Sequence, residues 1–136
     1  MASIWFKAGV DAFAKGELAW KAAGGATVKG MLADTALYAP DEDEASMTPV
    51  AAGRRNTDQP LTLIDATGGG ICDASDITFS AVAAGDPVQG VILYKFVTND
   101  AGSTPICFLE FTEPVTPNGG DIVIAWDNGD FKIMRI

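Results

Sequence analysis

The sequence of 136 residues contains no histidine. Histidine is the commonest general base and metal ligand in proteins, so its absence excludes the Ser-His-Asp and Cys-His types of nucleophilic site. Cysteine is nearly as scarce, and two residues do not form a disulfide framework. We expect Cys72 and Cys107 to be reduced core residues, because cysteine outside disulfides is among the most buried residue types. A bridge between the two is the alternative.

Positive charge is also scarce, since 9 Lys and Arg stand against 18 Asp and Glu and the net charge is −9. A protein that binds nucleic acid or an anionic membrane surface needs clustered Lys and Arg. No apolar run approaches the roughly 18 to 20 residues of a membrane span. Residues 1–5 lack the basic and apolar regions of a secretory signal. The sequence therefore predicts neither nucleic acid nor a membrane as partner, and a chain that is made in the cytoplasm.

Apolar residues, by contrast, are plentiful: the hydrophobic fraction of 48% provides a core for a single domain over residues 1–136. One short helix is predicted over residues 3–15, with Ser3 as its N-cap and Gly16 as its end. Apolar side chains recur along this segment at helical spacing and predict one buried face. That face comprises Phe6, Val10 and Phe13.

After residue 16 the pattern changes to short apolar runs divided by turns, which is typical of antiparallel β-structure. Residues 88–97 are largely apolar, with an uninterrupted run at 91–94, as expected of a strand that is buried on both faces. The Asn-Gly pair at 128–129 lies between two apolar runs and predicts a terminal hairpin. We predict an all-β (mainly β) antiparallel sandwich of jelly-roll type, with the short N-terminal helix. The expected strands are 17–20, 27–33, 61–65, 77–82, 88–97, 106–111, 121–126 and 131–136.

Residues 34–60 have no clear period and are predicted to be a long loop, which is usually functional or mobile. The loop contains four consecutive carboxylates, Asp41, Glu42, Asp43 and Glu44. A calcium site is one interpretation, but the ligand spacing and central glycine of an EF-hand are missing. We expect residues 41–44 to form a solvated loop or a patch that faces a partner.

The same loop contains the pair Arg54 and Arg55. Arginines clamp carboxylates through two parallel hydrogen bonds, which suits a protein interface. The preferred interpretation is a surface pair that balances the charge of residues 41–44, and an interface role is the alternative.

Three other features carry weaker signals. The glycines at 68–70 predict a turn, because no Gly-Lys-Ser/Thr follows as in a phosphate loop. Asp73 and Asp76 have the chemistry of a glycosidase pair, but any acidic protein offers such pairs. Trp20 and Trp126 have rings that stack on sugars, although such residues more often pack into the core.

Four segments, residues 1–16, 27–34, 91–95 and 114–129, together resemble small virion proteins of tailed bacteriophages. The resemblance runs along the whole chain and includes no catalytic motif. It implies a non-enzymatic structural protein, namely a capsid cement or decoration protein with a jelly-roll-like fold. Such a protein clips neighbouring major capsid protein subunits together on the exterior of the virion, and is made in the host cytoplasm.

From this resemblance we expect the major capsid protein as partner, a homo-oligomer such as a dimer, and no cofactor. A phage tail or neck component is the alternative. A carbohydrate-binding attachment module is another, motivated by the tryptophans and Tyr94, and a small acidic hydrolase has least support. The candidate interface residues are Trp5, Asp41, Glu42, Asp43, Glu44, Arg54 and Arg55.

Overall fold

The structure is a computed structural model and describes residues 3–65, 71–126 and 133–135. It is mainly β, with a large antiparallel sheet and two short α-helices, so the predicted fold class is confirmed. The jelly-roll connectivity stays a prediction. The strands are β1 (Ile4–Trp5), β2 (Val28–Ala33), β3 (Arg54–Pro60), β4 (Leu63–Ile64), β5 (Ile71–Ala74), β6 (Ile77–Phe79), β7 (Val88–Val97), β8 (Asn99–Val115), β9 (Ile122–Ile124) and β10 (Met134–Arg135), and the helices are α1 (Lys7–Ala14), α2 (Met47–Val50) and the 3-10 helix η1 (Ala51–Gly53).

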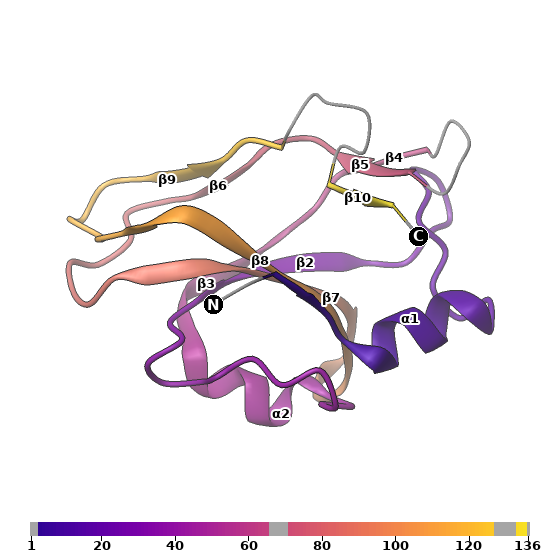
Figure 1. Ribbon diagram of the computed structural model, residues 1–136. Helices are drawn as coiled ribbons and strands as arrows, with labels where there is room; N and C mark the ends of the chain where they lie inside the picture. The colour runs from indigo at the N-terminus through magenta and orange to yellow at the C-terminus, as the bar shows by residue number, and fades with distance from the viewer. Residues whose placement is uncertain (1–2, 66–70, 127–132, 136) are drawn as a thin grey trace.

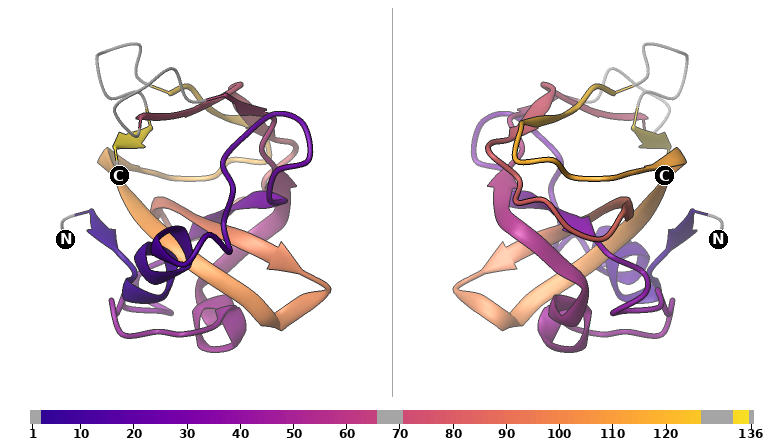
Figure 2. Two further views of the ribbon diagram at one scale, coloured as in Figure 1. Left: turned by 90° about the vertical axis from the view of Figure 1, so that its right-hand side faces the viewer. Right: turned by 90° about the vertical axis from the view of Figure 1, so that its left-hand side faces the viewer.

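A five-stranded antiparallel sheet of order β1-β8-β7-β2-β3 forms the middle of the molecule. Two smaller sheets, β10-β5-β4 and β6-β9, lie over one of its faces (Figure 1). The segment that contains α2 lies against the opposite face, as the end-on views of Figure 2 show. The fold therefore has three layers, with the long sheet between the other two.

The central strand β7 is buried on both faces, as its continuous apolar run predicted. Val91 and Leu93 belong to the core under the small sheets, whereas Ile92 and Tyr94 belong to the core over α2. Since successive residues of a strand point to opposite faces, only an uninterrupted apolar run fills both cores at once.

The prediction of a long loop over residues 34–60 is wrong in its second half. This part forms α2, η1 and β3, and β3 pairs with β2 along the edge of the large sheet. Met47 and Val50 are fully buried beneath the sheet. The helix is only four residues long, and β3 (Arg-Arg-Asn-Thr-Asp-Gln-Pro) has no apolar alternation, so neither has a periodic signal in the sequence.

The predicted helix 3–15 is shorter in the structure, where α1 covers Lys7–Ala14. The segment before it pairs with β8 as β1, and the N-cap is Phe6 rather than Ser3. The predicted buried face is confirmed for Phe6, which is fully buried, and Phe13 packs partly buried against the core. It is wrong for Val10, which is 43% exposed, because Gly9 and Ala12 are the buried residues of the helix. The small side chains let α1 lie close to β8, and Gly16 ends the helical segment with a φ of 73°, as expected.

Three strand predictions also change. Residues 17–20 form no strand. The predicted strand 106–111 is longer in the structure, where β8 begins at Asn99, and the β7–β8 turn lies at Thr98 with a φ of 57°. The predicted turn at 127–130 and the glycines 68–70 lie outside the described residues. The predicted terminal hairpin would pair the last two strands with each other. In the structure β9 pairs with β6, and β10 pairs with β5.

Candidate functional site

A shallow groove of about 340 Å³ runs beside α1 at the end of the large sheet. It combines an indole ring, an exposed apolar side chain and several charged groups. We call this set of residues the α1 surface. It consists of Trp5, Lys7, Val10, Asp11, Ala14 and Glu42.

Backbone contacts with β8 hold the α1 surface in place. Trp5 pairs with Cys107 in the β1–β8 ladder, and the Phe6 N–H donates to the carbonyl oxygen of Ile106 at 2.9 Å. One turn later, Gly9 lies so close to β8 that a Cβ atom there would be 2.6 Å from the Cα atom of Ile106. The Trp5 ring packs edge-to-face on Phe13, which shields part of the indole and fixes its orientation (centroid distance 6.4 Å, interplanar angle 80°).

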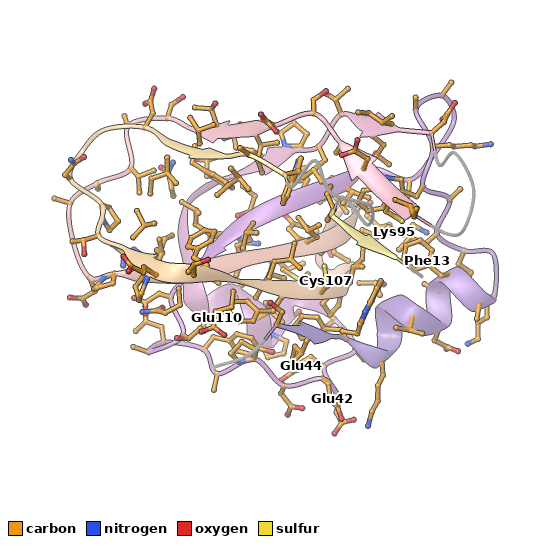
Figure 3. The ribbon with its side chains drawn as sticks, turned by 45° about the horizontal axis from the view of Figure 1, so that its top comes forward. Phe13, Glu42, Glu44, Lys95, Cys107 and Glu110 are labelled. Atoms are coloured by element: carbon orange, nitrogen blue, oxygen red, sulfur yellow. The ribbon has the colours of Figure 1, made fainter. Side chains whose placement is uncertain are left out.

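The acidic run folds into a turn that touches the start of α1. The Asp43 N–H donates to the Asp41 side chain at 2.9 Å, and the Lys7 N–H donates to the Glu42 carbonyl oxygen at 2.9 Å. The Lys7 ammonium lies 2.6 Å from the Asp43 carboxylate and 3.4 Å from that of Glu42. Its hydrogen bond to Asp43 is the main cause that raises the pKa of Lys7. Figure 3 shows Glu42 and Glu44 on this loop beside the N-terminal end of α1.

These contacts bring together only part of the predicted interface. Trp5 and Glu42 line one groove, and Asp43 joins them through Lys7. Val10 and Asp11 were missed, because the helical periodicity assigned Val10 to the core. Chemically, the α1 surface offers an apolar centre with charges of both signs at its rim, since Lys7 pairs with Glu42 and Lys15 pairs with Asp11. This arrangement suits an apolar side chain of a partner that is surrounded by polar groups.

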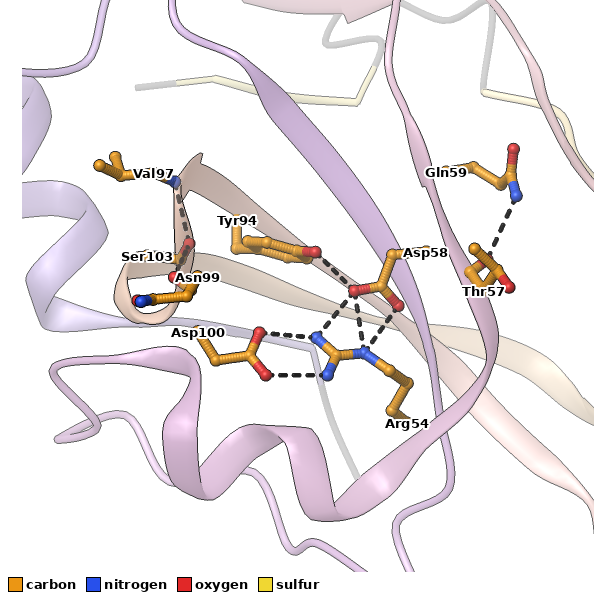
Figure 4. Close-up of polar contacts among 9 residues, drawn as sticks. All are labelled: Arg54, Thr57, Asp58, Gln59, Tyr94, Val97, Asn99, Asp100 and Ser103. Carbon is orange, nitrogen blue, oxygen red and sulfur yellow. Dashed lines mark hydrogen bonds and ion pairs between the residues drawn. The ribbon is translucent and has the colours of Figure 1, made fainter.

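Arg54 lies elsewhere, in an internal ion-pair network at the start of β3 (Figure 4). Its guanidinium donates to both oxygens of Asp58 at 2.9–3.0 Å and to both oxygens of Asp100 at 3.0 Å. The Tyr94 hydroxyl donates to Asp58 at 2.5 Å. Burial is the main cause that raises the pKa of Tyr94, and the hydrogen bond to Asp58 adds to it. Arg54 is thus committed to partners within the chain.

The tip of the β7–β8 hairpin places Asp100 in this network. The Ser103 hydroxyl accepts from the Val97 N–H at 3.0 Å and donates to the Asn99 carbonyl oxygen at 2.7 Å, which closes the turn (Figure 4). The hydrogen bonds from Arg54 are the main cause that lowers the pKa of Asp100. The network therefore ties the hairpin tip to the edge strand β3.

Arg55 also has a structural position. It donates to the buried Asp34 carboxylate at 3.2 Å and to the carbonyl oxygen of Asp86 at 2.9 Å. The side chain of Asp34 is only 2% exposed, so this ion pair is nearly desolvated. The interpretation of Arg54 and Arg55 as a surface pair that balances residues 41–44 is wrong, because their carboxylate partners are Asp58, Asp100 and Asp34.

The tryptophans and the paired acids also have local partners. Trp20 is 7% exposed and donates its indole N–H to the Asp73 carbonyl oxygen at 2.8 Å, so core packing is confirmed for Trp20. Trp126 is partly buried, and its indole N–H donates to a backbone carbonyl at 3.0 Å. The Asp76 carboxylate accepts a hydrogen bond from the Trp126 backbone N–H at 3.1 Å. The Asp73 carboxylate accepts one from the backbone N–H of Ala74 at 2.9 Å.

Two searches concern the described residues 3–65, 71–126 and 133–135. Over those residues no three His, Cys, Asp or Glu side chains gather in a way that would hold a metal ion. No helix among them is long and apolar enough to span a bilayer. Every buried side-chain nitrogen and oxygen in these ranges has a hydrogen-bond partner.

Comparisons with protein-family models, with curated proteins and with solved structures find no match to the chain.

Both cysteines are buried and neither forms a disulfide. Burial raises the pKa of the Cys72 thiol to about 11 and that of Cys107 to about 12. Thiols with raised pKa values stabilise the fold below the unfolded pKa of about 8.5 and lose that contribution as the pH rises toward the folded values. We therefore expect the urea midpoint of the native protein to fall more between pH 7 and pH 10 than that of a Cys72→Ala, Cys107→Ala double variant.

The same experiment includes a chemical readout. At pH 8, iodoacetamide is expected to leave both thiols unmodified in the folded protein and to alkylate both in 8 M urea, as mass spectrometry would report. Rapid alkylation of Cys107 in the folded protein would contradict the assignment of both cysteines as buried thiols with raised pKa values. Urea midpoints that change equally with pH in the native protein and the double variant would contradict it as well.

Proposed function

We propose that the chain is a non-catalytic protein-binding module, and that it acts as a cement protein that binds neighbouring major capsid subunits on the exterior of a phage head. The observation that carries the proposal is the α1 surface, where Val10 is 43% exposed beside Trp5 and the carboxylates of Asp11 and Glu42. An exposed apolar centre with a charged rim is the usual anatomy of a protein interface.

Three further properties support the proposal. The resemblance of the sequence to small virion proteins suggests the setting. The net charge of −9 favours solubility before assembly and a partner with a positive surface. The candidate residues Arg54 and Arg55 form ion pairs within the fold, which leaves Trp5 and the acidic turn as the candidate contact residues.

The location of the chain in purified particles tests the setting. We expect mass spectrometry to detect the chain in virions of the phage that encodes it, and image reconstruction to place it on the outer face of the head. Density at the tail or neck would support the alternative component instead. Virions that lack the chain altogether would refute the proposal. The predicted dimer stays a prediction.

Substitution at the α1 surface tests the contact itself. Val10→Asp places a charge in the apolar centre of the proposed interface, and we expect it to weaken binding to capsid shells at least tenfold, as loss of a central contact does at a protein interface. Sedimentation of the purified protein with shells that lack it measures the affinity. Val97→Asp is the matched control, because Val97 is 42% exposed and lies in the β7–β8 hairpin, away from α1.

The control separates a local effect from a change in charge or stability. If Val10→Asp bound capsid shells as tightly as the native chain does, the contact with the capsid would not involve the α1 surface. Equal weakening by both variants would indicate that the effect is electrostatic and general rather than specific to the α1 surface.

A further inference from the structure

A second groove, of about 570 Å³, lies between β8 and β9 on the side of the molecule away from the α1 surface. Its size falls in the range of binding pockets, about 300–1,000 Å³. Its walls are continuous with the core between the large sheet and the small sheets. The apolar side chains in its walls include Leu109, Phe111, Val115, Ile122, Trp126 and Ile133.

Two strands border this groove, and β9 has an edge without a strand partner among the described residues. Strand β9 pairs with β6 alone, and β8 pairs with β1 only at Cys107 and Phe108 (Figure 1). Val123, in the middle of β9, is 60% exposed. An unprotected edge with an exposed valine is a template for another strand, and natural sheets usually block such an edge with charge or proline.

The charge of the groove selects the kind of segment that would fit. Among the described residues that line the groove, Glu110 and Glu113 are the charged ones. Glu113 is exposed. An anionic, apolar groove beside an unpaired strand edge therefore matches an extended segment that carries both apolar and cationic side chains.

We propose that the β8–β9 groove is a second docking site, which binds an extended segment of a partner protein in which apolar residues alternate with lysine or arginine. The segment adds to the edge of β9 through backbone hydrogen bonds. Every second side chain then enters the groove, and those between them lie along its rim, where lysine or arginine meets the exposed Glu113. A second site extends the proposed function, because two separate contacts let one module bridge two neighbouring subunits.

A peptide titration on the isolated protein tests this site. The probe is a fluorescein-labelled octapeptide that alternates valine with lysine, and its match has glutamate in place of each lysine. We expect fluorescence anisotropy to show binding of the lysine peptide at least tenfold tighter than of the glutamate peptide. Val123→Lys is expected to weaken binding of the lysine peptide at least fivefold, and Glu113→Gln about threefold.

Val97→Lys is the control for net charge, because it adds the same charge at a similarly exposed valine far from the groove. We expect it to bind the lysine peptide nearly as the native chain does. Equal weakening by the two lysine variants, or no difference between the two peptides, would overturn the proposal. Binding of a small apolar dye that Val123→Lys abolishes, without any peptide binding, would overturn it in favour of a small-ligand site. Because this assay uses no capsid, its failure would leave the test at the α1 surface unaffected.

Discussion

Arg54→Ala is expected to lower the free energy of unfolding by about 3–5 kcal/mol. The substitution leaves two carboxylates without their cation, and the side chain of Asp58 is only 9% exposed. Tyr94 would remain hydrogen-bonded to Asp58, but a neutral hydroxyl does not balance a buried charge. Urea denaturation with linear extrapolation measures the change.

The matched control is Lys15→Ala, which removes an ion pair with Asp11 on the exposed side of α1. Both side chains of that pair are about 60% exposed, so we expect a change below about 0.5 kcal/mol. If the two variants lost similar amounts of stability, the Arg54 network would contribute no more than a surface pair.

The Arg54 network also predicts a dependence on acid. Hydrogen bonds from Arg54 lower the pKa of Asp100 in the folded state, so this carboxylate stabilises the fold above its unfolded pKa of about 3.9 and loses that contribution as the pH falls through the folded pKa. We expect the stability difference between the native chain and Arg54→Ala to narrow below about pH 4. A difference that stayed constant down to pH 2 would contradict the ionic basis of the network.

Gly9→Ala is the second substitution with a large expected effect, a loss of about 1–3 kcal/mol. In an ordinary helix the same change stabilises by nearly 1 kcal/mol. Here the new methyl group would lie 2.6 Å from the Cα atom of Ile106 and 2.7 Å from the carbonyl oxygen of Pro105, and neither backbone atom moves easily. Helix α1 would have to shift away from β8, together with the α1 surface. Urea denaturation measures the loss, and capsid-shell binding measures the effect on docking.

A position on the exposed side of the same helix provides the comparison. Ala14→Gly should cost at most about 1 kcal/mol through helix propensity alone, because Ala14 is the exposed last residue of α1 and its methyl group supports no packing in the core. An increase in stability on Gly9→Ala would show that helix propensity decides at this position and that the close approach to β8 has no energetic weight.

Much of the central sheet could be predicted from the sequence, because its signal is local. The apolar run 88–97 coincides with β7, and the run 27–33 with β2 to within one residue. Elements without a period could not be predicted. Strand β3 begins with two arginines, and its place at the edge of the sheet depends on pairing with β2, some 25 residues earlier in the chain.

The candidate site was predictable only in part for a similar reason. The carboxylate run 41–44 is visible in the sequence, and its first three residues are exposed in the structure, since consecutive charges repel one another and favour solvent. The role of the arginines was not visible, because Arg54 meets Asp100 across 46 positions and Arg55 meets Asp34 across 21. The exposure of Val10 depends on the close contact of Gly9 with β8, which helical periodicity does not encode.

By itself the sequence determined the mainly β class, the strand buried on both faces and the excess of negative charge, because composition and local periodicity act over a few residues. Only the tertiary structure decided which charged groups pair inside the fold, which face of α1 is exposed and where a groove opens between β8 and β9. These depend on partners that are distant in the chain, and such partners meet only when the layers pack.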